Sequence, residues 1–169
     1  MEELLVLAYE SLLRTKPLLK AASACAQLCE ELGIGPLASD LRQNVRELTI
    51  LALRAPHATT TLSTLLSEGG ASAKLHLFWL HRDLATVVCY VRRRRNHGDA
   101  SADALTHAYD LWLAPVHTGA MRAAFRMARA AIAPADADID RAIASHAQLD
   151  METIERALER VAQLVPTAD

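Results

Sequence analysis

The chain is poor in aromatic residues and has no long uninterrupted apolar stretch, and both absences narrow its class. Only 4% of the 169 residues are aromatic although 51% are hydrophobic, so aliphatic and alanine side chains must fill the interior. An interior of that kind suits closely packed helices. No stretch approaches the roughly 18 apolar residues of a membrane-spanning helix, and the start at Met1, Glu2 and Glu3 lacks the basic residues of a secretory signal. We therefore expect a soluble, cytoplasmic protein.

The chain also lacks a strong net charge and the common catalytic motifs. A formal net charge of −2 and a pI near 6.4 give no general attraction to nucleic acid. HExxH, a paired Glu-x-x-His and a glycine-rich phosphate loop are all absent from the sequence. We expect neither enzymatic activity nor a cofactor or metal. The alternative is a metal or acid–base site built from His76, His81, His107 and His117 with Asp83 and Asp110.

The chain has only three cysteines, and their spacing matches no paired-cysteine motif. Cys25, Cys29 and Cys89 form no CxxC spacing, which argues against a zinc or redox motif. Cys25 and Cys29 do share a helix face, so a metal or redox pair is the alternative. We interpret all three as small hydrophobic residues of the core.

The spacing of apolar residues predicts helices along the whole chain, and no segment alternates with period two for long enough to be a strand. We expect Pro17 to kink or divide the first helix, Ser101 to be an N-cap, and Asp150 to cap the last helix. A chain of this length holds one domain with a substantial core. The expected helices cover residues 4–32, 36–54, 59–67, 71–95, 101–113, 117–133 and 150–164, with a turn or short helix after Pro134.

Four polar or aromatic residues lie on helices that are otherwise apolar. Asp40 and Asn44 are four positions apart, so their side chains are neighbours on one helix face. Trp79 belongs to the predicted helix over 71–95, and His117 follows Pro115. Taken singly, Asp40 and Asn44 can be solvated, Trp79 can be core, and His117 can be an ordinary helix-end histidine.

Together, these residues resemble the glycolipid transfer protein family. In that family an all-helical fold carries one sphingolipid in an apolar cavity and holds the head group with these residue types. The similarity rests on the pair Asp40 and Asn44, on the glycines at 69 and 70 before a helix with Trp79, and on the spacing from Tyr109 to His117. It implies an all-α, single-domain, two-layer helical sandwich of about eight helices over residues 1–169, most simply a monomer.

The chemistry of a ceramide fits the same residues. A ceramide offers an amide N–H, an amide C=O and hydroxyls beside two long chains, so its site needs an acceptor, a donor and apolar space. Asp40 can accept from the amide N–H or from sugar hydroxyls, and His117 can donate to the amide C=O. Trp79 offers a flat face to a sugar ring, and Asn44 can both donate to and accept from hydroxyls.

The apolar part of the ligand needs a cavity between the helices. We expect its lining to come from large apolar residues near the four polar ones, although the same residues can also simply pack against one another. At about 0.8 kcal/mol per CH₂, an acyl chain in such a cavity nearly balances an acyl chain in a bilayer, so carriage in both directions needs no ATP. The expected lining residues are Leu48, Leu75, Phe78, Val87, Val116 and Phe125.

The head-group positions favour sugar over phosphate. In the ceramide-1-phosphate branch of the family, a Lys takes the place of Asn44 and Arg residues take those of Leu75 and Trp79, because a phosphate requires cations. The chain departs from the sugar-binding pattern at Glu47, where members usually have Lys. Arg46 or Arg82 can supply a cation nearby. The alternatives are ceramide-1-phosphate transfer and a lipid sensor or interaction module that does not transfer.

Transient membrane contact is expected of a transfer protein. Many family members have a Trp two residues after the His, where this chain has Gly119. Trp112 or the four arginines at 92–95 can take its place on an anionic membrane. The alternative for the arginine run is a solvated helix end, stabilised by the helix dipole.

Overall fold

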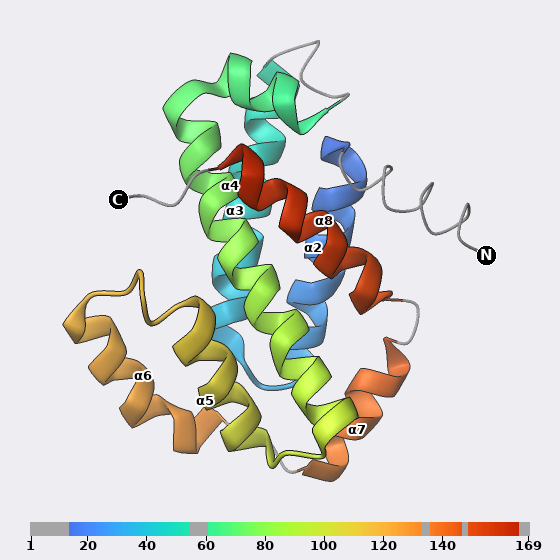
Figure 1. Cartoon of the computed structure of the whole chain (residues 1–169), viewed down its shortest axis with the longest axis vertical. Coiled ribbons are helices and arrows are strands. Elements are labelled where there is room, and N and C mark those ends of the chain that lie inside the picture. Colours follow the sequence, from blue (N-terminus) through green and yellow to red (C-terminus); the bar gives the residue numbers. More distant parts are fainter. Residues whose placement is uncertain (1–13, 55–60, 133–135, 147–148, 166–169) are drawn as a thin grey trace.

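The computed structural model describes residues 14–54, 61–132, 136–146 and 149–165, and within them the chain is helical, without a strand (Figure 1). The elements are α2 (Thr15–Glu31), α3 (Gly35–Arg54), α4 (Leu62–Arg92), the short π-helix η1 (Arg93–His97), α5 (Ser101–Trp112), α6 (Gly119–Ile132), α7 (Asp136–Ser145) and α8 (Met151–Leu164). The described part therefore confirms the predicted all-α class. The predicted helical residues 4–13, 59–60 and 133 lie outside the described ranges.

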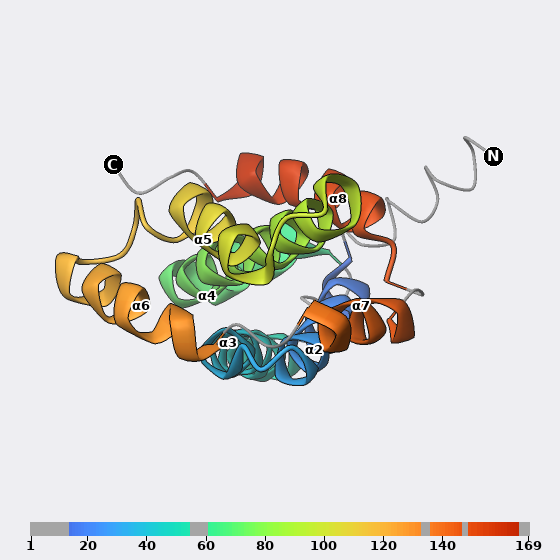
Figure 2. The same cartoon turned by 90° about the horizontal axis from the view of Figure 1, so that it is seen from below.

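The helices form two layers. Figure 2 shows α2 and α3 side by side in one layer and α4, α5 and α8 in the other, with α6 and α7 at opposite edges. The long helix α4 packs against α2 and α3 of the other layer and against α5 and α8 of its own. Its apolar residues recur at helical spacing, and Leu77, Leu80 and Leu84 are fully buried. Each buried leucine contributes about 1.5–3 kcal/mol of transfer free energy, which holds α4 in the centre.

The predicted break between a helix ending near Ser67 and one beginning at Ala71 is present as a kink within α4. Gly70 leaves the helical conformation there, with φ of 57° and ψ of −139°. Only glycine adopts that conformation readily, so the interruption is real although the helix resumes at once. The Thr61 hydroxyl accepts from the Thr64 N–H at 3.2 Å and begins this helix.

The helix ends confirm one predicted cap and correct another. The Asp150 carboxylate accepts from the backbone N–H groups of Glu152 and Thr153, which is the predicted N-cap of α8. The prediction for Ser101 was wrong. Ala100 occupies the N-cap position, and the buried Ser101 hydroxyl lies 2.9 Å from the Tyr90 hydroxyl instead.

Helix α2 accommodates both its proline and its two cysteines. Pro17 lies in the first turn of α2, where its missing N–H would have no helical partner in any case. Cys25 and Cys29 are fully buried in the core, and burial raises the pKa of the Cys25 thiol to about 12. Both behave as the small hydrophobic residues that the sequence indicated.

The arginine run at 92–95 is engaged within the protein. Arg92 pairs with Glu155 on α8, and Arg93 pairs with Asp99. Arg94 is only 9% exposed and pairs with Asp140 of α7 at 3.0 Å. The solvated helix end that we considered is therefore incorrect for Arg94. The run joins the end of α4 to α8 and η1 to α7.

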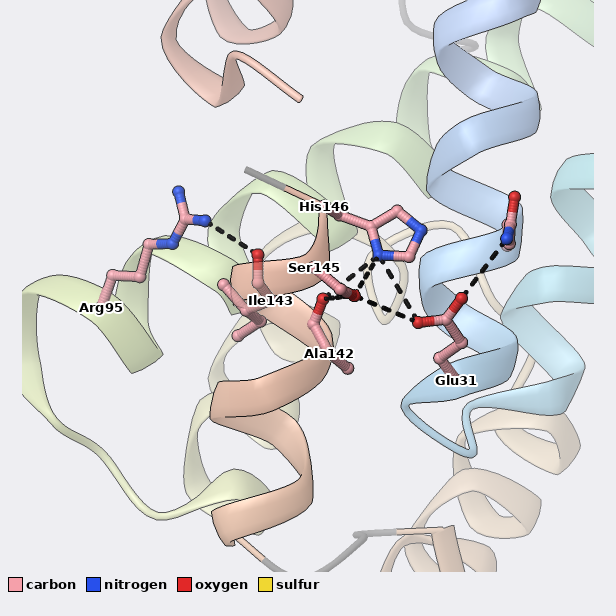
Figure 3. A network of polar contacts seen from close by, with 7 residues as sticks. Glu31, Arg95, Ala142, Ile143, Ser145 and His146 are labelled. Carbon is pink, nitrogen blue, oxygen red and sulfur yellow. Dashed lines mark hydrogen bonds and ion pairs between the residues drawn. The ribbon is translucent and has the colours of Figure 1, made fainter. Parts of the chain in front are cut away.

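Helix α7 is held by two sets of polar contacts (Figure 3). Arg95 donates to the Ile143 carbonyl at 3.1 Å. On the other side, Ser145 donates to Glu31 of α2 at 3.4 Å, and the His146 ring nitrogen Nδ1 lies 3.5 Å from the same carboxylate. These contacts join α7 to η1 and to the C-terminal turn of α2.

Candidate functional site

A polar pocket of about 290 Å³ lies where α3 faces α4. It is lined by Asp40, Gln43, Asn44, Leu75, His76, Trp79, Asp83, His117 and Met121. All four head-group residues that the sequence singled out are among them. We call this hollow the polar pocket.

Helical spacing brings the lining residues to one face of each helix. Asp40 and Asn44 are one turn apart on α3, as expected. On α4, His76, Trp79 and Asp83 follow the i, i+3, i+7 spacing of a single helix face. Packing of α3 against α4 then places the two rows opposite each other.

Asn44 lies at the centre of a hydrogen-bond chain between the two helices. Its Nδ2 donates to Asp83 Oδ2 at 3.1 Å, and its Oδ1 lies 3.1 Å from His76 Nδ1. Asn44 is 7% exposed and Asp83 only 2%. The solvated amide that was one alternative for Asn44 is therefore incorrect, because both ends of its amide are engaged.

Asp83 is a buried carboxyl group beside a second one. Burial, with a smaller contribution from the nearby Asp40, raises its pKa to about 8, and the hydrogen bond from Asn44 opposes the shift. Near neutral pH the polar pocket therefore contains one carboxyl group that is mostly protonated and one, on the exposed Asp40, that can ionise. Partial burial raises the pKa of Asp40, and His117 opposes that shift.

His117 faces the pocket from the segment between α5 and α6. Its Nδ1 lies 3.0 Å from the Tyr109 hydroxyl, and its ring centroid lies 5.9 Å from that of Trp79. When Tyr109 donates to Nδ1, the proton of the neutral imidazole resides on Nε2. Partial burial lowers the pKa of His117, although Asp40 raises it, so the neutral form is favoured near pH 7. The ring then offers an Nε2–H donor.

A second, apolar pocket of about 270 Å³ adjoins the polar pocket. We call it the apolar pocket. Three residues, Asp40, His117 and Met121, line both hollows. The other residues of the apolar pocket are Ile34, Pro36, Leu37, Thr86, Leu105, Tyr109, Leu113, Ala124 and Phe125.

The structure places the predicted cavity residues in several environments. Phe125 lines the apolar pocket, stacked on Tyr109 with ring centroids 3.5 Å apart, whereas Leu75 lines the polar pocket. Leu48 and Val87 are buried in the core. Half-buried positions are taken by Phe78 and Val116.

The three possible head-group contacts are not among the described pocket-lining residues. Arg46 is exposed and Glu47 is half-buried on α3. Arg82 lies near the Phe78 and Trp112 rings and donates to the Trp112 carbonyl at 3.4 Å. Its guanidinium therefore contacts Phe78 and Trp112, and Arg82 is not among the residues that line the polar pocket.

Four residues that the sequence alone did not assign to a lipid site also line the two pockets: Gln43, His76, Asp83 and Tyr109. A signal for two of them was present, because His76 and Asp83 share a helix face with Trp79. What the sequence could not show is that Asp83, which is 39 positions from Asn44, meets it in a hydrogen bond.

The alternative acid–base or metal site is not supported by the arrangement of the histidines. His81 lies on the other side of α4, edge-on to Trp112, and burial lowers its pKa to about 4. His107 is exposed on α5. Across the described ranges, no group of three or more His, Cys, Asp or Glu side chains is placed to hold a metal ion.

Pocket size alone does not identify the site. Hollows of about 500 and 530 Å³ lie elsewhere, the first beside His81 and Trp112 and the second beside Asn96 and Asp150. The polar and apolar pockets are smaller, but they adjoin each other and share a carboxylate and an imidazole. Such a pair of pockets suits one amphipathic ligand.

The family model of the glycolipid transfer protein (GLTP) matches residues 13–143. The chain therefore belongs to the glycolipid transfer protein family, whose members are lipid transfer proteins rather than enzymes. No curated protein matches the chain.

Two solved structures show the same fold. The fungal glycolipid transfer protein HET-C2 is 21% identical with a TM-score of 0.70, and the match covers 90% of this chain and 81% of that one. FAPP2, which selects simple glycosphingolipids using the GLTP fold, is 20% identical with a TM-score of 0.77, covering 92% and 88% of the two chains. The predicted two-layer helical fold is confirmed. In the part of the chain that is described, every helix is too short or too polar to cross a membrane.

Proposed function

We propose that this protein binds a glycosylated ceramide and transfers it between membranes. The observation that carries the proposal is that the polar and apolar pockets share Asp40 and His117. One ligand with a polar head and an apolar chain can therefore occupy both pockets, with its amide at the junction. No covalent step is required.

The amide of the ceramide fits the shared residues. Asp40 accepts from the amide N–H, and the Nε2–H of His117 donates to the amide C=O. The Tyr109 hydroxyl, 3.0 Å from Nδ1, keeps His117 in the tautomer that can donate. Two opposite hydrogen bonds fix the direction of the amide, so the head group points towards Trp79 and the chain towards Phe125.

The polar pocket favours a neutral sugar over a phosphate. Among the described residues that line it there is neither Lys nor Arg, and it contains the carboxyl groups of Asp40 and Asp83. A phosphate monoester carries about −1.5 to −2 charges near neutral pH and needs cations. A sugar instead packs its C–H face on Trp79 and hydrogen-bonds to Asn44. We expect glucosylceramide to compete better than ceramide-1-phosphate for the protein.

The lipid chain enters the apolar pocket beside α6. Met121, Ala124 and Phe125 of this helix line that pocket, and α6 lies at the edge of the molecule (Figure 2). A small outward movement of α6 would enlarge the pocket for a long chain. At about 0.8 kcal/mol per buried CH₂, such a pocket nearly balances the bilayer, so that loading and release are both feasible.

The exposed face of α6 is suited to contact an anionic membrane. It presents Met121 and Met127, which are 47% and 78% exposed, together with the exposed Arg122 and Arg126. Residues 119–132 contain no Asp or Glu. Because Met121 also lines both pockets, docking by this face would bring the site mouth to the lipid surface.

A vesicle assay tests the proposed function. Donor vesicles contain fluorescent glucosylceramide with a non-exchangeable quencher, and acceptor vesicles contain neither. We expect purified protein to move the lipid in proportion to its concentration, without ATP. Failure to move any sphingolipid would reject transfer, and tight binding with slow exchange would instead identify a lipid sensor.

A further inference from the structure

The amide of Asn44 is held at both of its ends by residues of α4. Its Nδ2 donates to Asp83 at 3.1 Å, and its Oδ1 lies 3.1 Å from the Nδ1 of His76. An amide has two N–H donors and a carbonyl oxygen with two lone pairs. One N–H and one lone pair of the same amide are therefore left for further partners, while its plane is fixed.

The position of Asp83 suits support of Asn44 more than contact with a ligand. Asp83 is 2% exposed, whereas His76 and Trp79 are half-buried and Asp40 is exposed. A carboxyl group at that depth has few possible partners, and Asp83 accepts a hydrogen bond from Asn44. An influence of Asp83 on the ligand must pass mainly through the amide that it holds.

The sugar is the part of the ligand that would benefit from a fixed Asn44 side-chain amide. The ceramide amide is matched by Asp40 and His117 in the proposed function, so Asn44 is left for the head group. Neighbouring sugar hydroxyls each donate and accept, and one N–H beside one C=O can pair with two of them together. An amide that is free to rotate would exchange its donor and acceptor ends and lose that match.

We propose that Asp83 and His76 are positioning residues for head-group selection, which fix the Asn44 amide so that it recognises two neighbouring hydroxyls of a sugar. This inference rests on the proposed function. It attributes part of the selectivity for glycosylated over simple ceramide to the two side chains that hold the Asn44 amide. The residues that touch the sugar provide the rest.

The test compares transfer of fluorescent glucosylceramide with transfer of fluorescent ceramide between neutral vesicles. Asp83→Leu removes the acceptor for Asn44, and we expect the glucosylceramide to ceramide rate ratio to fall roughly tenfold, the equivalent of one lost hydrogen bond. Asp83→Asn keeps a carbonyl acceptor and should retain the ratio within about twofold. His81→Leu, a buried polar position on the same helix but outside the polar pocket, is the matched control and should leave the ratio unchanged.

A double substitution separates positioning from general stability. Once Asn44→Leu has removed the amide, adding Asp83→Leu should change the ratio no further, because coupled residues are not additive. If Asp83→Leu lowers transfer of both lipids equally, or lowers the ratio again in the Asn44→Leu protein, the inference is overturned. Should Asp83→Leu fail to fold by circular dichroism, His76→Phe tests the other end of the amide with the same expected fall in the ratio.

The outcome also separates this inference from the proposed function. A wild-type protein that moves no glucosylceramide rejects the function and the inference with it. A wild-type protein that prefers glucosylceramide, with a ratio unchanged by both Asp83→Leu and His76→Phe, rejects the inference alone.

Discussion

Trp79 on α4 and His117 before α6 face each other with ring centroids 5.9 Å apart. The indole lines the polar pocket alone, while the imidazole lines both pockets. In the proposed function, this contact sets the indole that packs on the sugar beside the imidazole that donates to the ceramide amide. It also means that the two residues can be tested separately, because each serves a different part of the proposed ligand.

Substitution of Asp40 tests the shared carboxylate. Asp40→Val should abolish transfer of glucosylceramide, because the lipid's amide N–H would lose its acceptor at a cost of about 1–3 kcal/mol. Initial rates in the vesicle assay measure this. Asp103→Val, at an exposed aspartate of α5 outside both pockets, should retain the wild-type rate. Full transfer by the Asp40 variant would remove this residue from the site.

The two tryptophans of the chain form a matched pair for testing head-group recognition. Trp79→Ala should weaken binding of glucosylceramide far more than that of ceramide, because only the sugar packs on the indole. Trp112→Ala removes an indole that lies beside His81, outside the polar pocket, and should affect both lipids alike. Competition binding with the two lipids gives the comparison. An equal loss for both lipids in the Trp79 variant would contradict the sugar platform.

Charge substitutions on α6 test membrane docking. Replacing Arg122 and Arg126 with Gln should weaken binding to anionic vesicles by about 1 kcal/mol per residue, with little change on neutral vesicles and a smaller difference in high salt. Vesicle co-sedimentation measures the affinity. The control replaces Arg141 and Arg160, which are exposed on α7 and α8.

The arginine run at 92–95 gives the contrasting expectation. Its side chains pair with Glu155, Asp99 and Asp140, so replacing them with Gln should lower thermal stability. If the variant of the arginine run folds but no longer binds anionic vesicles, while the α6 variant still binds them, the run rather than α6 is the membrane-docking surface.

The buried carboxyl group of Asp83 should make stability depend on pH. Its folded-state pKa of about 8 lies above the ordinary value of 3.8, so the folded protein binds the proton more tightly than the unfolded chain does. Stability from this group is therefore fully present below the unfolded pKa and is lost as pH rises through the folded pKa. Each unit of elevation corresponds to about 1.4 kcal/mol.

Asp83→Asn isolates that contribution. The variant cannot ionise at this position, so its melting temperature relative to wild type should rise as pH increases from about 5 to about 9. Asp99→Asn, at a carboxylate paired with Arg93 far from the pocket, serves as the control. A constant difference between Asp83→Asn and wild type across this range would show that Asp83 has an ordinary pKa.

Local features of the chain were readable from the sequence because they depend on nearby residues. The apolar period predicted the helices, Gly70 marked the kink in α4, and Asp150 was the expected cap of α8. The spacing of Asp40 and Asn44 placed both on one face of α3. In each case the reason is backbone geometry or hydrogen bonding within about one helical turn.

Contacts between distant segments were decided only by the tertiary structure. Asn44 of α3 hydrogen-bonds to Asp83 of α4 between the two layers. Ser101 does not cap α5 as expected, and its hydroxyl lies beside the Tyr90 hydroxyl instead. Two arginines of the run, Arg92 and Arg94, pair with acidic residues of α8 and α7. Periodicity shows which face of a helix is buried, but it does not show which helix covers that face or in what register. The sequence by itself thus determined the helices and singled out four candidate residues for a lipid site, whereas packing of α3 on α4 decided which side chains surround them.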